Sequence, residues 1–321
     1  MALYTDLQAY YPLNGNANDY LGINNGTATG TVTWPAGNFG DSAALSNTTA
    51  GNYINAGMAA VSFTGGFTVS GWYNNTVGWA ATAPYGVQDI VGKDGVDNTR
   101  EWKAYIQSGI IGCACYNLNG ARRIARTAPA PADGVWYHAV FTYDGGTASS
   151  GIKIYINGTQ VDNADDNLGP YPGMTAPTNT VKLGQYGPAA PPLPAGDTLR
   201  FSGQQDDVAI WTRELTAAEV LAIYTAGNAG NPLSSLLGPS DLQGQFSSVV
   251  HSVAGADADL QGMFSSVVHS VAAADADLQG MFSSVVHSAT VASRADLQGQ
   301  FSSVVHSVAA ADADLQGQWI S

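Results

Sequence analysis

Charged side chains are scarce in this 321-residue chain, at 11% of the residues, and most of them are acidic. Asp and Glu number 25 against 11 Lys and Arg, which gives a formal net charge of -14 at pH 7. This charge gives the chain no electrostatic means of holding nucleic acid, so we expect no nucleic-acid partner. No apolar run approaches the roughly 18 residues of a membrane-spanning helix, and we expect no membrane insertion.

Cysteine is almost absent, since Cys113 and Cys115 are the two in the chain. Two residues apart on a strand, they share one face, a spacing that suits neither a disulfide nor, without a second pair, a zinc site. We expect both to be reduced and partly buried, as in a protein that folds in a reducing compartment. Residues Met1–Asp6 also lack the basic segment and apolar stretch of a secretory signal. We therefore expect no export by that route.

Glutamate is rare as well, with Glu101, Glu214 and Glu219 as its three occurrences. Hydrolysis of a glycosidic bond needs two carboxyl groups a few ångströms apart, one as acid and one as nucleophile or base. Glu101 has no acidic partner at i+2 or i+4, and the other two lie at the start of a predicted helix. The sequence therefore predicts that the protein is not an enzyme.

The end of the chain is a repeat. The phrase that opens with Asp241-Leu242-Gln243-Gly244 returns from Asp259, Asp277, Asp296 and Asp314, at spacings of 18, 18, 19 and 18 residues. Gly and Pro residues are concentrated just before it. We divide the chain into a first domain at residues 1–227, a linker at 228–240 and a repeat tail at 241–321.

The repeat length fits a helix. Eighteen residues at 3.6 per turn make five complete turns, so each repeat returns to the same face. Leu242, Phe246 and Val249 fall on one side of such a helix and would need a partner to be buried. We predict an oligomeric α-helical rod over 241–321, similar to a coiled coil. A homotrimer would suit the fibres that this architecture resembles, but the sequence does not decide between two and three strands. A β-solenoid with an 18-residue rung and a disordered tail are the alternatives.

The first domain is predicted to be mainly β, an antiparallel sandwich. Alternating stretches at Phe67–Trp72, Trp136–Tyr143 and Ile152–Ile156 are separated by turn signals. Asn157-Gly158 is typical of a type I′ hairpin turn leading into Thr159–Val161. These signals predict short strands joined by tight turns.

One helix is expected in this domain. Thr216 is a suitable N-cap, and Glu219 three positions later completes a capping box. Leu221, Ile223 and Tyr224 supply apolar contacts before Gly227 ends the helix.

Five segments follow one another in a recognisable order: Ala9–Asp19, Phe67–Trp72, Trp136–His138, Ile154–Gly158 and Asp206–Trp211. Together they resemble the laminin-G-like or concanavalin A-like lectin/glucanase jelly roll. The resemblance covers about 225 residues and implies two packed antiparallel sheets. It also implies recognition of sugars or of cell surfaces.

Members of that family often carry a structural calcium ion near the N-terminal loop and the Asp-Asp strand. Asn16, Asp19, Asp206 and Asp207 offer the oxygen ligands that calcium prefers. Asx-rich segments are also ordinary turn chemistry, which is the alternative.

Long loops rich in aromatic residues and Pro are larger than a compact sandwich requires. Aromatic rings stack on the apolar faces of sugars, so Trp79, Tyr85, Tyr171 and Tyr186 are the candidate ligand-binding residues. The alternative for each is that it packs its own loop or contacts a neighbouring subunit.

A jelly roll joined to a self-associating repeat resembles a bacteriophage fibre or another virion appendage. We predict a virion structural protein, a fibre or capsid decoration, that is assembled in the host cytoplasm and displays a surface for cell-surface glycans. Other virion proteins would be its further partners. The alternative is a cellular surface or secreted adhesin of the laminin-G-like type.

Overall fold

The computed structural model describes most of the first domain and the strands of the repeat. The described residues are 3–46, 52–76, 87–95, 99–117, 122–176, 178–185, 200–237, 242–246, 253–264, 271–282, 289–301, 308–309 and 312–319. The chain forms two compact units, Met1–Leu236 and Leu237–Ser321. None of the helices in this described part has the length and apolar character needed to cross a membrane.

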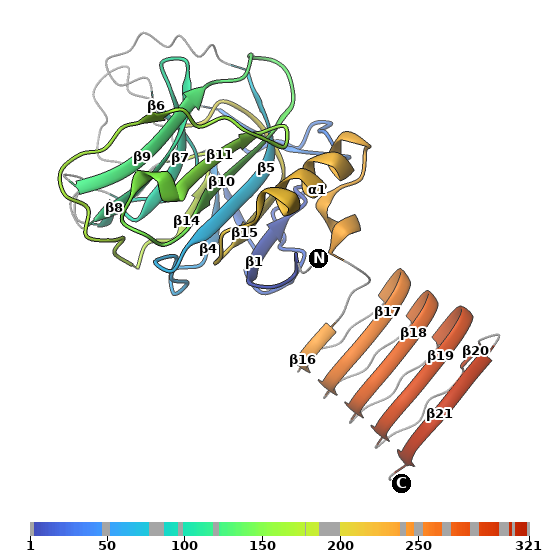
Figure 1. Ribbon diagram of the computed structural model, residues 1–321. Coiled ribbons are helices and arrows are strands. Elements are labelled where there is room, and N and C mark those ends of the chain that lie inside the picture. The colour runs from blue at the N-terminus through green and yellow to red at the C-terminus, as the bar shows by residue number, and fades with distance from the viewer. Residues whose placement is uncertain are drawn as a thin grey trace. The chain divides into compact units, whose positions relative to one another are not determined.

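The first unit consists of two antiparallel sheets, as predicted (Figure 1). The seven-stranded sheet has the order β1-β15-β5-β10-β11-β12, with β3 also beside β15. Its strands are β1 Leu7–Tyr11, β3 Ala43–Leu45, β5 Phe67–Asn75, β10 Tyr137–Tyr143, β11 Ile152–Ile156, β12 Thr159–Gln160 and β15 Gly203–Trp211. The eight-stranded sheet has the order β13-β9-β8-β7-β6-β14-β4-β2. Its strands are β2 Thr27–Thr29, β4 Tyr53–Gly57, β6 Val87–Lys93, β7 Trp102–Gln107, β8 Ile110–Asn117, β9 Arg122–Pro129, β13 Ala164–Asp165 and β14 Val181–Leu183.

The core lies between the inner faces of the two sheets. Trp102 of β7 stacks on Phe67 of β5 with the ring centroids 4.6 Å apart, which joins one sheet to the other. Cys113 and Cys115 lie on the inner face of β8, where both are buried and free. Both side chains are buried more completely than expected, and their reduced state stays a prediction.

Two hairpin turns set the strand register. Asn157 and Gly158 both have positive φ, 50° and 76°, as a type I′ turn requires, and they join β11 to β12. Ser108 and Gly109 repeat this pattern between β7 and β8, with φ of 51° and 82°. The first turn confirms the prediction, and the second was not anticipated.

Helix α1, Ala217–Asn228, lies over the seven-stranded sheet (Figure 1). Thr216 is its N-cap, and the predicted capping box with Glu219 is present. Trp72 of β5 stacks with Tyr224, with centroids 6.2 Å apart. Gly227 fits here because a Cβ would lie 2.6 Å from the Trp72 ring.

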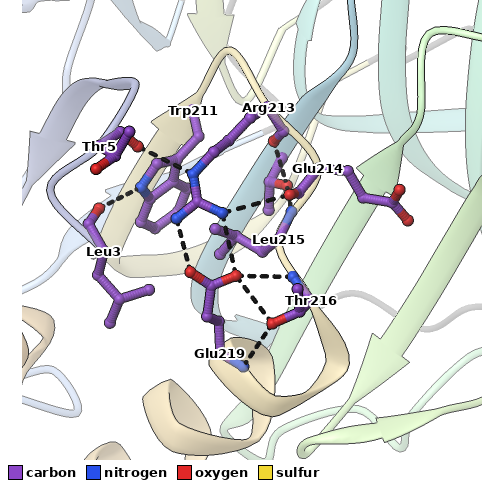
Figure 2. A network of polar contacts seen from close by, with 9 residues as sticks. Leu3, Thr5, Trp211, Arg213, Glu214, Leu215, Thr216 and Glu219 are labelled. Atoms are coloured by element: carbon purple, nitrogen blue, oxygen red, sulfur yellow. Dashed lines mark hydrogen bonds and ion pairs between the residues drawn. The ribbon is translucent and has the colours of Figure 1, made fainter. Parts of the chain in front are cut away.

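An arginine joins the start of this helix to the N-terminal segment, as Figure 2 shows. The Arg213 guanidinium donates to both carboxylate oxygens of Glu219, at 2.7 and 3.0 Å, and to the carbonyl of Thr5 at 3.0 Å. Trp211 donates to the carbonyl of Leu3 at 2.7 Å. These contacts hold the first described residues against the last strand of the sandwich.

The segment after α1 is anchored to the sandwich. The described part of this unit also has two short 3-10 helices, η2 at Ser149–Gly151 and η3 at Leu233–Leu236. Leu233 is buried, and its backbone N–H donates to the Asp207 carboxylate at 2.8 Å. The sandwich unit therefore extends to Leu236, because an apolar residue and a buried acceptor anchor the chain beyond the helix.

The repeat tail forms β-strands over residues for which the 18-residue period predicted a helix. The strands are β16 Leu242–Phe246, β17 Val253–Phe264, β18 Val271–Phe282, β19 Ala289–Phe301, β20 Val308–Ala309 and β21 Asp312–Trp319. All pair in parallel, and equivalent residues of successive repeats face each other. These described strands correspond to the alternative of an 18-residue rung. Composition disfavours a helix here, since Gly recurs in all five copies and β-branched Val in the four complete ones.

Candidate functional site

Two of the predicted aromatic-rich loops leave the sandwich at the same end. Residues 77–86 connect β5 to β6, and residues 186–199 connect β14 to β15. The candidate residues Trp79, Tyr85 and Tyr186 belong to these loops and lie outside the described residues. The described residues that flank the loops show where they are anchored.

The ends of the two loops are hydrogen-bonded to each other. The backbone N–H of Thr76 donates to the carbonyl of Ser202 at 3.0 Å. The N–H of Ser202 donates to Oε1 of Gln88 at 3.1 Å, and Gln88 is buried. Gln185 and Arg200 form an isolated β-bridge. We call this region, marked by these five residues, the loop end of the sandwich.

Two further segments complete the loop end. The Ser108-Gly109 turn lies there, and its Gly109 carbonyl accepts from the N–H of Ala130 at 3.0 Å. The carbonyl of Asn75, at the end of β5, accepts from the N–H of Gly134 at 2.8 Å. The loops therefore start from strand ends and turns that are fixed by backbone hydrogen bonds, which suits a binding surface on a rigid scaffold.

Tyr171, the fourth candidate, is in the core and not at the loop end. Its side chain is 8% exposed, and its hydroxyl lies 3.4 Å from that of Tyr143. Its segment contacts the far end of β8, where Asn117 donates to the carbonyl of Gly173 at 2.8 Å. Ile110, at the other end of this eight-residue strand, is next to the loop end. The two ends of β8 are roughly 24 Å apart. Tyr171 therefore has no open face for a sugar, which corrects its assignment as a ligand-binding residue.

Asp19 organises its own loop. Its two carboxylate oxygens accept from the backbone N–H groups of Tyr10, Leu21, Ile23 and Asn24, at 2.9 to 3.2 Å. These four N–H groups use the carboxylate lone pairs through which Asp19 would bind a calcium ion. Close by in the sequence, Asn16 accepts from the N–H of Asn18 in an exposed Asx turn.

Asp206 and Asp207 are also used by the protein itself. Asp206 accepts from the N–H groups of Asn38 and Phe39, both at 2.8 Å, and burial raises its pKa to about 7. Asp207 accepts from the Tyr10 hydroxyl and from the N–H of Leu233, and burial raises its pKa to about 6.

The residues proposed to bind calcium thus do not fit a shared ion. Within the described ranges, no group of three or more His, Cys, Asp or Glu side chains is placed to hold a metal. A carboxyl group that binds calcium must be ionised and must keep free lone pairs. Asn16 and Asp19 form Asx-type turn contacts with the backbone, as the alternative predicted. Asp206 and Asp207 are buried in the sandwich.

The sequence analysis missed a group of buried charges on the outer face of the eight-stranded sheet. Asp89 of β6 accepts from Lys103 of β7 at 3.0 Å, and Asp94 and Tyr116 lie in the same buried region. Burial raises the pKa of Asp94 to about 7. The signal was a charged residue inside each of two strands, Asp89 in β6 and Lys103 in β7. Each carboxyl faces a cation, Lys103 for Asp89 and Arg100 for Asp94 at 3.8 Å, so the buried charges compensate one another within the sheet.

Glu101 lies in the core, on the opposite face of this sheet. Its carboxylate is 3.0 Å from the Lys93 amine, and both side chains are buried. Burial raises the pKa of Glu101 to about 7. A carboxyl enclosed between the sheets has no access to a saccharide.

No curated protein matches the chain. Among solved structures, the binding domain of Paraclostridial Mosquitocidal Protein 1 is similar at 14% identity and a TM-score of 0.52, over 69% of this chain and 52% of that one. The botulinum neurotoxin serotype C1 binding domain is similar at 17% identity and a TM-score of 0.51, over 69% and 52%. The chain spans about half the length of these binding domains. At these identities, the likeness establishes a shared fold.

The sheet order, the short helix over one sheet and the type I′ hairpin agree with the resemblance seen in the sequence. The family model Laminin_G_3, of the concanavalin A-like lectin/glucanases superfamily, matches residues 46–221, more than half of the chain. The chain belongs to this superfamily.

Proposed function

We propose that the sandwich is a recognition module that binds a cell-surface glycan through its loop end. The observation that carries the proposal is the joining of two aromatic-rich loops at their bases by the Thr76, Gln88 and Ser202 hydrogen bonds. Loops far apart in sequence are thereby presented together on a rigid support. Similar structures bear names that describe them as binding domains, which supports the same use of this fold.

The aromatic residues of these loops supply the contacts in this proposal. Trp79 and Tyr85 belong to one loop and Tyr186 to the other. Sugar rings have apolar faces that stack on aromatic rings, and such rings also carry much of the energy of protein interfaces. The module is proposed to bind without cleaving, because Glu101 is enclosed in the core and paired with Lys93.

We further propose that the protein is a virion structural component, in which the tail serves assembly and the sandwich faces the host. The in-register repeat supports this role, because such ladders extend easily. An adhesin on a cell surface is the second candidate. Immunogold labelling of purified particles and of cells, with antibody to the sandwich, separates the two.

The binding proposal is tested by titrating the full chain with glycans selected from an array. Trp79→Ala and Tyr186→Ala are each expected to weaken binding at least tenfold, about 1.4 kcal/mol, with no change in Tm. Tyr4→Ala is the matched control, because Tyr4 is 41% exposed and distant from the loop end. It follows Leu3, which contacts Trp211, and Trp211 lies at the opposite end of β15 from Ser202. Equal binding by all variants, or equal weakening by Tyr4→Ala, would refute the assignment. Release of sugar from the bound glycan would refute the non-enzymatic role.

A further inference from the structure

The Lys and Arg side chains of the sandwich are mostly neutralised by carboxylates of the same chain. Such pairs join Lys93 to Glu101, Arg100 to Asp94, Lys103 to Asp89, Arg123 to Asp166, Arg126 to Asp162 and Asp165, Lys153 to Glu214, and Arg213 to Glu219. Lys182 lies over the ring of Tyr53, 5.3 Å from its centre. With 25 Asp and Glu against 11 Lys and Arg, acidic partners are in excess. A cation left without one is therefore unusual in this chain.

Arg200, at the loop end, is such a cation. It directly follows the loop of residues 186–199, and it is partly exposed, so a ligand can reach it. Among the described residues, none is joined to its guanidinium by an ion pair or a hydrogen bond, and the Nε atom is buried without a partner. A buried donor that lacks an acceptor loses its hydration without compensation. The Arg200 side chain therefore has donors that an external acceptor can use.

Gln185 lies beside Arg200 and has an unused acceptor. The two residues face each other in an antiparallel β-bridge, which places their Cα atoms about 5 Å apart. Gln185 is 3% exposed, and its Oε1 atom is buried without a hydrogen-bond partner. A guanidinium that donates and an amide oxygen that accepts are therefore adjacent at the base of one loop.

The backbone on either side of this bridge is anchored to both sheets. The N–H of Gly184 donates to the carbonyl of Ile90 in β6 at 2.8 Å, and the N–H of Phe201 donates to the carbonyl of Gly184 at 3.0 Å. Phe201 is buried in the core, with its ring centre 6.3 Å from that of Tyr73 in β5. Arg200 and Gln185 are thereby held in place before a ligand arrives, which lowers the cost of binding.

We propose that Arg200 selects glycans that carry a carboxylate, and that Gln185 accepts from a neighbouring hydroxyl of the same sugar. A guanidinium matches the two oxygens of a carboxylate in both geometry and charge. Sugar acids such as sialic acid and glucuronic acid present a carboxylate close to hydroxyl groups. One cation suits one carboxylate, whereas the net charge of -14 opposes a polyanion. This inference rests on the proposed binding of a glycan at the loop end and names the chemical class of that glycan.

Paired probes test this selection with the full chain. Glycans that end in sialic acid or glucuronic acid are titrated beside the same glycans with the carboxylate converted to an amide. The unaltered chain is expected to bind one of the acids at least tenfold more tightly than its amide, and Arg200→Gln is expected to bind the two equally. Arg122→Gln is the matched control, because Arg122 is exposed and pairs with Asn117, at the opposite end of β8 from the loop end. This control loses the same charge and is expected to keep the preference for the acid.

The outcomes separate this inference from the proposed function. Binding of neutral glycans that depends on Trp79 and Tyr186 but not on Arg200 would overturn the selection of acids and leave glycan binding intact. Tighter binding of sulfated than of carboxylated glycans, or an equal loss of preference in Arg122→Gln, would overturn the assignment of a carboxylate to Arg200. Failure of the unaltered chain to bind any glycan would overturn both the inference and the proposed function. An unchanged Tm in each variant confirms that the fold is retained.

Discussion

The Lys93–Glu101 pair in the core gives the sharpest prediction about what holds the sandwich together. The two side chains are 1% and 0% exposed, with the amine 3.0 Å from the carboxylate. The amine also donates to the carbonyl of Val61 at 2.6 Å and lies 5.5 Å from the centre of the Phe63 ring. In the variant Lys93→Met, Glu101 is left in the core without a cation. Breaking a buried pair in this way costs about 3–5 kcal/mol.

The expected loss is large enough to measure by two methods. For a unit of this size, it corresponds to a fall in Tm of roughly 6–20 °C. Burial raises the pKa of Glu101 to about 7, above its ordinary value of 4.5. A carboxyl with a raised folded-state pKa favours the folded state below 4.5 and loses that contribution as the pH rises through 7. Without Lys93 the pKa rises further, so the deficit of the variant grows from pH 5 to pH 8.

Urea unfolding followed by tryptophan fluorescence at pH 5 and pH 8 measures this difference. The matched control is Lys153→Met, because Lys153 also pairs with a glutamate, Glu214, but the side chains are 34% and 28% exposed. That variant is expected to lose less than about 1 kcal/mol. In Lys93→Met/Glu101→Leu, which removes both charges, part of the stability returns. Equal losses for the two lysine variants, or a loss at Lys93 that does not change with pH, would refute the reasoning.

Four other predictions follow from the buried groups. Burial lowers the pKa of His138 to about 3, whereas an unfolded histidine titrates near 6.5, so the chain loses about 2 kcal/mol between pH 7 and pH 5. His138→Gln removes that part of the pH dependence in urea titrations, and an unchanged slope would contradict it. The hydrogen bond from Arg213 lowers the pKa of Glu219 to about 2, so its contribution is present above pH 4.5 and lost as the pH falls through 2. Glu219→Gln is expected to cost about 1 kcal/mol at pH 7 and less at pH 3, as measured by thermal unfolding; an equal cost at both pH values would exclude the ionised cap. Tyr171→Ala is expected to lose about 3 kcal/mol or more with glycan affinity retained, and a binding defect in a stable variant would return Tyr171 to the site. EDTA is expected to leave Tm unchanged, because the Asp19 carboxylate already accepts four N–H groups; a fall reversed by calcium would count against this.

Local signals in the sequence predicted the local features of the sandwich. Asn157-Gly158 adopts the turn that its residue types favour, because Gly and Asn tolerate positive φ. Thr216 and Glu219 cap α1 because both partners are three residues apart and need nothing else from the fold. Leu221 shows the limit of local reasoning, since it was expected to make an apolar contact and is exposed. Which face of a short helix is buried depends on the sheet beneath it.

The tail shows why a repeat length alone does not determine secondary structure. Eighteen residues are five turns of a helix and are also a complete rung of a ladder, so the period is satisfied by both. Composition distinguishes them, because Gly in all five copies and Val in the four complete ones lower the intrinsic stability of a helix. In such a ladder each residue pairs with its equivalent in the next repeat, as Leu278 does with Leu297, so one repeated sequence is enough to form it.

The candidate site could be predicted only in part, because its parts are joined by contacts between distant residues. Tyr171 and Trp79 both lie in loops rich in Gly and Pro, and nothing local separates them. The burial of Tyr171 depends on Tyr143, and the joining of the two loops depends on a hydrogen bond between Thr76 and Ser202, 126 residues apart. Aromatic composition therefore selects candidate loops, whereas the order of the strands decides which of them share a surface. For this reason a Trp79→Ala/Tyr186→Ala double variant is the decisive test, because non-additive losses of affinity are expected if both loops contact one ligand.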